Sequence, residues 1–415
     1  MSVITIQTVD AIVTRPATEN LVVVRVRTSE PGLEGLGCAT FTQRAAAVVE
    51  VVHTYLRPLL VGRDVSRVGE LWRLMHVNGY WRGGPVLMNA ISGVDQALWD
   101  IKGKRAGMPV YDLLGGKVRE AAAVYQHVAG PDGQALVDRA MPLIERGVTC
   151  LRVQVAAASQ GPDTLAAGAA GYGGVGGGSR VARGGLPGRY FDPAAYRRSV
   201  VRAFAVLRDR LPAEVELIHD VHSRLSAREA LAFAKRLEPF DLFFLEDPLP
   251  PEHIDALVRL RDETSTPLAM GELFTSRAQW LPLVRDGLID FLRLHVSAVG
   301  GLTPAWEAAQ VCEAFGVKTA WHGPRDTSPV GHAAQLHLDL ASHAFGVQEF
   351  AGFTDAEREV FAGLPTLEGG MLYLNDRLGI GVELDEAAAR RFPPRFDEVI
   401  DWTQARRPDG GLSYP

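Results

Sequence analysis

The chain has 415 residues, a formal net charge of −6 and 22% charged side chains, with no dominant basic stretch, so we expect no nucleic-acid partner. Its 47% hydrophobic content and mean hydropathy of +0.03 are typical of a soluble globular protein. No apolar run approaches the roughly 20 residues that a membrane helix needs, so we expect no membrane partner.

The cysteines and the N-terminus indicate the compartment. Cys38, Cys150 and Cys312 are odd in number and far apart, which favours a reducing environment without disulfides. The N-terminus, "MSVITIQTVDAIVTRP", has no basic segment followed by an apolar one, so it resembles a strand more than a signal peptide. We therefore expect a cytoplasmic protein.

The first part of the chain combines strands with helices. Residues 3–28 hold two β-branched runs joined by a Pro-containing turn, and "EPGLEGLGCAT" predicts a further strand. From about 45 to 116, apolar residues recur at spacings of three and four, which predicts helices. This order indicates a small α+β domain over 1–121.

Residues 122–385 alternate between strand and helix patterns, as a (β/α)₈-type barrel requires. A doubly wound sheet is the alternative, but it usually carries a glycine fingerprint after its first strand, and none follows the first strand here. The Pro- and Gly-rich tail, 386–415, is expected to pack back on the N-terminal domain. The predicted barrel strands are 122–128, 150–155, 215–221, 242–247, 267–272, 290–296, 317–323 and 346–350.

A glycine-rich stretch at 166–190 interrupts this alternation. It contains a literal G-x-G-x-x-G from Gly171 to Gly176, but no clear helix begins there and glycines continue on both sides. We interpret it as a flexible loop after the second barrel strand and not as a phosphate site. A loop at that end of a barrel can serve as an active-site lid.

Three carboxylates occur at matching strand ends. Asp220, Glu246 and Glu272 end the third, fourth and fifth predicted strands, and each is 26 residues from the next. They should converge at the carboxyl-end mouth of the barrel, where barrel active sites lie. Clustered acids repel one another, and an all-oxygen ligand set favours Mg²⁺ over zinc.

The motif "LIHDVHSR" places histidines on both sides of Asp220. Strand alternation puts His222 on the face of Asp220 and His219 on the other. His222 is therefore the acid–base candidate, and His219 is expected to be structural.

Other predicted strands bring further polar groups to the same mouth. With a cation, they suit a small anionic, hydroxyl-rich substrate whose carboxylate and enediolate need positive charge. These groups are His127, Arg152, Gln154, Arg293, His322, Asp326 and Glu349.

These motifs resemble the enolase superfamily, and within it the mannonate dehydratase family of acid-sugar dehydratases, some labelled starvation-sensing proteins. The resemblance covers nearly the whole chain. It implies a modified (β/α)₇β TIM-like barrel beneath an α+β capping domain, and a homo-oligomer, either a tetramer or an octamer. It rests on "YWRGGPVLMNAISGVDQALWDIKGKRAGMPVYDLLGG", "HDVHSRL", "LEDPLP", "GELF", "WHGPRDTSPVGHAAQLHLDL" and "VQEF".

The resemblance also implies roles for individual residues. One Mg²⁺ per subunit would bind Asp220, Glu246 and Glu272. An arginine, here Arg152, acts with a tyrosine to take the C2 proton, and His222 protonates the departing 3-hydroxyl. The implied substrate contacts are Thr42, His127, Gln154, Glu272, Arg293, His322, Asp326 and Glu349.

The chain departs from the family pattern at three places. The family's tyrosine spacing gives Thr164 here, and the nearest Tyr-Gly pair begins at Tyr172, our candidate for the catalytic tyrosine. Thr42 replaces a usual asparagine, and Cys38 a usual aspartate. The terminal "GLSYP" lacks the usual tryptophan.

The sequence thus favours a Mg²⁺-dependent hydro-lyase that converts D-mannonate or D-gluconate to the 2-keto-3-deoxy acid. A dehydratase or racemase for another sugar acid is one alternative, because a fold does not fix the substrate. A relative with little or no dehydratase activity and a regulatory or binding role is the other.

Overall fold

The computed structural model describes residues 3–155, 190–397 and 405–413. These residues pack as two compact units. The first unit comprises the described residues of 1–124, 271–285 and 292–397, and the second comprises those of 125–270, 286–291 and 398–415.

A three-stranded antiparallel sheet opens the first unit, in the order β1 (Ile6–Thr14), β2 (Leu21–Thr28), β3 (Glu34–Cys38). Its β-branched side chains suit a pleated surface, and nearly all of β2 is buried. Val24 of β2 lies opposite Gly37 of β3. The sheet therefore presents a tight apolar face to the helix that covers it.

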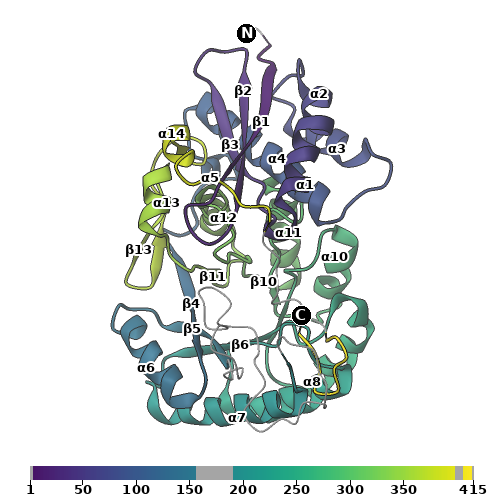
Figure 1. Ribbon diagram of the computed structural model, residues 1–415, viewed down its shortest axis with the longest axis vertical. Coiled ribbons are helices and arrows are strands. Elements are labelled where there is room, and N and C mark those ends of the chain that lie inside the picture. The colour runs from purple at the N-terminus through teal and green to yellow at the C-terminus, as the bar shows by residue number, and fades with distance from the viewer. Residues whose placement is uncertain (1–2, 156–189, 398–404, 414–415) are drawn as a thin grey trace. The chain divides into compact units, whose positions relative to one another are not determined.

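That helix is α4 (Pro85–Ala106), which lies against β2 and β3 (Figure 1). It begins with proline in its first turn and ends at Gly107 in the left-handed conformation, both common helix-boundary signals. A Cβ placed on Gly93 would lie 2.4 Å from a Val24 methyl carbon. Glycine is needed here because the helix and the sheet approach so closely.

The remaining elements of the first unit are short helices and short strands. A π-helical turn, Val51–Leu56, joins the first two helices. The others are α1 (Ala45–Glu50), α2 (Arg57–Leu60), α3 (Val68–Val77), α5 (Val110–Leu113), α10 (Arg277–Arg285), α11 (Leu302–Phe315), β10 (Lys318–Thr319), α12 (Pro329–Ala341), β11 (Gln348–Glu349), α13 (Asp355–Val360), β12 (Phe361–Ala362), β13 (Thr366–Glu368), β14 (Met371–Tyr373), β15 (Glu383–Leu384) and α14 (Glu386–Ala389).

The second unit is built on consecutive parallel strands with helices between them. Each strand pairs with the next in chain order, from β4 through β8. Two strands, β4 and β9, run across the division between the units. The elements are β4 (Ala122–Gly130), α6 (Gly133–Ile144), β5 (Cys150–Val155), α7 (Pro193–Arg210), β6 (Glu216–Asp220), α8 (Ala227–Leu237), β7 (Phe244–Glu246), α9 (Leu257–Glu263), β8 (Leu268–Met270) and β9 (Phe291–Leu292).

Helix caps fix where the second unit's helices begin. The carboxylate of Asp192 accepts from the backbone N–H groups of Ala194 and Ala195 at the start of α7. Ser226 and Glu229 form a reciprocal capping box at the start of α8. These caps fix the first residues of α7 and α8.

All eight predicted barrel strands overlap an observed strand, β4 through β11 in order. The β13–β14 hairpin and the β12–β15 pair were not predicted, because runs of two or three residues are too short to show a period. Of the glycine-rich stretch 166–190, all but Tyr190 lies outside the described residues. No helix within the described ranges is long and apolar enough to cross a membrane.

The predicted tail, 386–415, makes two sets of contacts. Asn20 exchanges hydrogen bonds with the backbone of Arg395, and the Thr14 hydroxyl donates to the Ala389 carbonyl. Further along, the Phe191 N–H donates to the Arg406 carbonyl. The first part of the tail therefore packs on β1 and its turn, whereas 405–413 contacts the segment before α7.

We predict opposite effects of alanine at two helical glycines. Gly93→Ala should lower the free energy of unfolding by about 1–3 kcal/mol, because the new methyl group must displace Val24. Gly69→Ala in α3 should raise it by about 0.5–1 kcal/mol, because no described atom lies within 4 Å of the new carbon. Thermal unfolding followed by circular dichroism compares them, and equal melting temperatures would disprove the tight packing of α4.

Candidate active site

Two carboxylates of the second unit lie at the carboxyl ends of neighbouring parallel strands. Asp220 is the last residue of β6 and Glu246 the last of β7, and strand pairing sets them opposite each other. Both are buried. Adjacent buried carboxylates repel each other and lose hydration, so the fold must supply positive charge.

Arg152 of β5 supplies that charge. Its Nη1 lies 3.3 Å from Asp220 Oδ2 and 3.5 Å from Glu246 Oε2, and the three side chains are almost fully buried. A guanidinium is protonated at every physiological pH, so this cation is permanent. The structure thus brings together three residues that the sequence assigned to one barrel mouth.

His222 is held beside Asp220 by the backbone. Its N–H donates to Asp220 Oδ1 at 2.7 Å. His222 and Ser223 have φ of 57° and 60°, and Asp247, one residue beyond β7, has φ of 39°. Such left-handed backbone costs of order 1–3 kcal/mol per non-glycine residue and concentrates at functional sites. Because β6 ends at Asp220, the strand alternation that we used to predict a shared face does not extend to His222.

His219 has a structural environment. Its Nδ1 lies 2.9 Å from the Val153 carbonyl and its Nε2 lies 2.7 Å from the Tyr196 hydroxyl, all in the interior. Burial lowers the pKa of His219 to about 4, so the ring is neutral at pH 7. Nδ1–H therefore donates to the carbonyl, and Nε2 accepts from the tyrosine.

Two predicted substrate contacts flank Arg152 in the sheet. His127 of β4 is the pairing partner of Arg152, and its ring stacks near Tyr125. Gln154 lies two residues after Arg152 on β5 and is buried, and its Nε2 makes no hydrogen bond to the described residues. A buried amide of this kind suits a ligand oxygen.

In the first unit, His322 contacts one other candidate residue, Glu272, and also His295, which we did not name from the sequence. Its Nε2 lies 3.3 Å from Glu272 Oε2, and its Nδ1 lies 3.0 Å from His295 Nδ1. One of the facing Nδ1 atoms must donate and the other accept. Burial lowers the pKa of His295, so two facing imidazolium ions are disfavoured.

Arg293 and Glu349 form a second fully buried ion pair. Arg293 Nη2 donates to Glu349 Oε2 at 2.9 Å, and the Gly323 N–H donates to the same oxygen at 3.0 Å. Nearby in the sequence, Asp326 Oδ2 accepts from the Thr42 hydroxyl at 3.1 Å. Burial raises the pKa of Asp326, and this hydrogen bond opposes the rise.

The sequence contained a signal for His295 that we did not use. His295 follows Arg293 by two residues in the run "DFLRLHV", so alternation would have put both on one face. Tyr196 offered no comparable signal because it lies on α7, away from the strand ends. Tyr172 and Thr164 lie outside the described residues.

The second unit fits part of a Mg²⁺ site. Asp220 Oδ2 is buried and receives no aligned hydrogen bond from the described residues, and Glu246 stands beside it. Carboxylate oxygens in such a pair suit a hard divalent cation. Glu272, the third predicted ligand, belongs to the first unit and follows the end of β8 by two residues. Within the described ranges, no cluster of three His, Cys, Asp or Glu residues has metal-binding geometry.

Two family models match the chain. The "Mandelate racemase / muconate lactonizing enzyme, N-terminal domain" matches residues 3–115, and the "Enolase C-terminal domain-like" model matches residues 145–388. The chain belongs to the enolase superfamily. The pairing of an N-terminal domain with a longer C-terminal domain agrees with the capped barrel predicted from the sequence.

Curated relatives narrow this assignment. The chain is 47% identical over 432 residues to a protein of Pantoea ananatis described as "D-galactonate dehydratase family member RspA", and each chain is fully covered. A family member of Enterocloster bolteae is 48% identical over 419 residues, again with full coverage. This enolase-superfamily protein is thus a member of the D-galactonate dehydratase family, a group of acid-sugar dehydratases.

Solved structures support the fold. An enolase from Pantoea ananatis, crystallised with bound D-gluconate and Mg, matches with a TM-score of 0.92 at 45% identity and covers 99% of this chain and 100% of its own. A putative dehydratase from Mesorhizobium loti matches with a TM-score of 0.79 at 24% identity, which bears on the fold alone. The fold is a modified (β/α)₇β TIM-like barrel with an α+β capping domain.

We predict that Arg293→Met lowers the free energy of unfolding by about 3–5 kcal/mol, because it leaves the carboxylate of Glu349 buried beside an apolar side chain. Adding Glu349→Gln should recover most of the loss, since the amide oxygen can still accept from Gly323. Urea unfolding measures both variants. A single variant as stable as the wild type would show that the pair does not carry this buried charge.

Proposed function

We propose that this chain is a Mg²⁺-dependent dehydratase of a hexonate, either D-gluconate or D-mannonate. It would remove the C2 proton and the 3-hydroxyl and release the 2-keto-3-deoxy acid. The observation that carries the proposal is the buried pair Asp220–Glu246 at adjacent strand ends, with His222 fixed to it by a strained turn. The 45% identical structure with D-gluconate and Mg supports this choice of ligands.

One Mg²⁺ per subunit is proposed to bind Asp220, Glu246 and Glu272. The first two have the required burial and pairing, and the sequence suggests the third. A bound Mg²⁺ would hold the substrate carboxylate and offset the charge that develops as the C2 proton leaves. Arg152 lies against two of these carboxylates and would share them with the bound cation.

We assign the protonation of the departing 3-hydroxyl to His222. An imidazole titrates near neutral pH, as an acid–base group must. The backbone N–H of His222 donates to the proposed metal ligand Asp220, and this contact fixes the position from which the His222 side chain extends. We assign the removal of the C2 proton to Arg152 together with Tyr172. A guanidinium stays protonated in proteins, so we infer that Arg152 stabilises Tyr172 as a phenolate, whose oxygen takes the C2 proton and becomes a neutral phenol.

The remaining polar residues are proposed to contact the substrate. Gln154 offers a buried amide without a hydrogen bond to described residues, and Thr42 and Asp326 form a hydroxyl–carboxyl pair that a sugar hydroxyl could join. His127, Arg293, His322 and Glu349 complete the proposed set. D-mannonate and D-gluconate differ only in configuration at C2, so the choice between them depends on the face from which the proton is taken.

We further propose that the protein acts in the cytoplasm as a homo-oligomer, a tetramer or an octamer. Its only proposed small-molecule partner is the sugar acid.

The experiment is to incubate the purified protein with Mg²⁺ and a panel of hexonates and pentonates, and to assay the 2-keto-3-deoxy product. We predict product from D-gluconate or D-mannonate, and a loss of roughly 10²–10⁴-fold in rate for His222→Asn. The matched control is His253→Asn, which changes an exposed histidine of the same unit and should retain the wild-type rate.

Calorimetry distinguishes failure of the metal site from failure of the chemistry. Asp220→Asn should weaken Mg²⁺ binding, whereas His222→Asn should not. Mg²⁺ binding by the wild type with no product from any acid would contradict the dehydratase proposal, and would favour a binding role or another enolate reaction.

A further inference from the structure

The turn between α3 and α4 presents two aromatic rings to solvent. Tyr80 is 80% exposed and Trp81 is 83% exposed, and their rings pack edge to face with centroids 5.2 Å apart. We call residues 77–82 the aromatic tip. Large apolar side chains gathered in one exposed place mark an interaction site more often than isolated ones do.

The backbone holds the tip in this pose. Tyr80 has φ of 63°, and the following Gly83 and Gly84 have φ of 85° and 82°. The Tyr80 N–H donates to the Val77 carbonyl, and the Trp81 N–H to the Gly79 carbonyl. A bulky residue in the left-handed region is strained, so a defined turn, and not a loose loop, projects the two rings.

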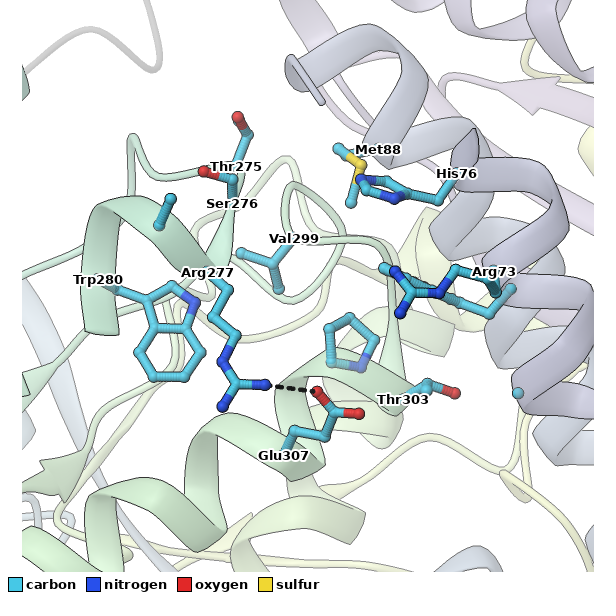
Figure 2. A pocket seen from close by; sticks show the side chains of 14 residues that line it. Arg73, His76, Met88, Thr275, Ser276, Arg277, Trp280, Val299, Thr303 and Glu307 are labelled. Carbon is cyan, nitrogen blue, oxygen red and sulfur yellow. Dashed lines mark ion pairs between the residues drawn. The ribbon is translucent and has the colours of Figure 1, made fainter. Parts of the chain in front are cut away.

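The same unit contains a groove beside α3, shown in Figure 2. Its volume is about 520 Å³, and its wall is formed by α3, α10, α11 and the start of α4. Arg277 and Glu307 face each other across it at 3.9 Å. We call this the α3 groove, and its apolar lining consists of Trp72, Met88, Trp280, Val299 and Pro304.

We propose that the aromatic tip of one copy of this chain inserts into the α3 groove of a second copy. The groove uses residues 69–76 of α3, and the tip begins at the next residue. A knob and a hole that adjoin on one surface can engage in both directions about a two-fold axis, which closes a symmetric dimer.

The sizes are compatible with this arrangement. Two aromatic side chains bury about 300–500 Å², whereas a stable interface buries about 800 Å² per partner. The tip therefore supplies about half of what a stable dimer needs, and the lining of the α3 groove, which the partner's tip would cover in the same contact, adds to it.

The polar groups are complementary as well. Nδ1 of His76, in the groove, is buried and makes no hydrogen bond to the described residues. Burial, Arg82 and Arg73 lower the pKa of His76, so its ring, which stacks on Trp72, is neutral and adds no charge to the apolar lining. Glu307 is 60% exposed and only loosely paired with Arg277, so its carboxylate can also receive Arg82 of the second copy.

Sedimentation velocity of the full chain over a concentration series tests the proposal. We expect the wild type to self-associate, and Trp81→Ser to weaken that association by about 30-fold or more, as for a buried aromatic hot spot. The matched control is Tyr55→Ser, which removes another exposed aromatic ring from the same unit and should leave association unchanged. Far-ultraviolet circular dichroism at the working temperature verifies that each variant is folded.

A charge exchange identifies the pairing. Arg82→Glu and Glu307→Arg should each weaken association, and a mixture of the two variants should associate more tightly than either alone, because a mixed pair has two Arg–Glu contacts, one native and one with the charges exchanged, whereas each variant alone has two like-charge contacts. Rescue by mixing requires contact between separate chains. A monomeric wild type, an unchanged Trp81→Ser variant, an equal effect of Tyr55→Ser, or no rescue on mixing would overturn the proposal.

Discussion

The placement of one buried cation between two buried carboxylates governs the second unit. Arg152 Nη1 lies within 3.5 Å of both Asp220 and Glu246, and none of the three side chains has appreciable access to water. Each charge would be costly to bury alone, so the three strands that carry these residues must stay together. Backbone pairing between β5 and β6 and between β6 and β7 holds the three strands in register and thereby maintains this arrangement.

The first unit solves the same problem in a similar way. Arg293 neutralises Glu349, and the Gly323 N–H supports the carboxylate. Arg152 lies within β5 and Arg293 directly follows β9, whereas each acid is the last residue of its strand. Polar side chains of this kind can bind a charged, hydroxylated substrate because folding has already ordered and desolvated them before the substrate arrives.

The sequence was sufficient to predict the fold because its hydrophobic patterns recur over most of the chain. β-Branched runs predicted β1 and β2, and the regular return of short apolar runs predicted all eight strands from β4 to β11. Acids at three of those strand ends then identified the candidate site. Resemblance to known dehydratases added the roles, which no pattern of burial or spacing could supply.

Other features depended on three-dimensional packing. The left-handed turn at His222 has no glycine or asparagine to announce it, so the strand alternation we applied there was extended two residues too far. The need for glycine at Gly93 arises from its contact with Val24, which is distant in the sequence. The contact between the rings of His295 and His322 joins residues 27 positions apart, so it is evident only in three dimensions.

The most direct test of this account is to follow the loss of the substrate's C2 proton. We would follow D-gluconate and D-mannonate by proton NMR in D₂O with the protein and Mg²⁺. The account predicts that the C2 proton signal of one acid disappears as a 2-keto-3-deoxy acid with deuterium at C3 accumulates. A C2 signal that stays constant in both acids, with Mg²⁺ shown to be bound, would contradict it.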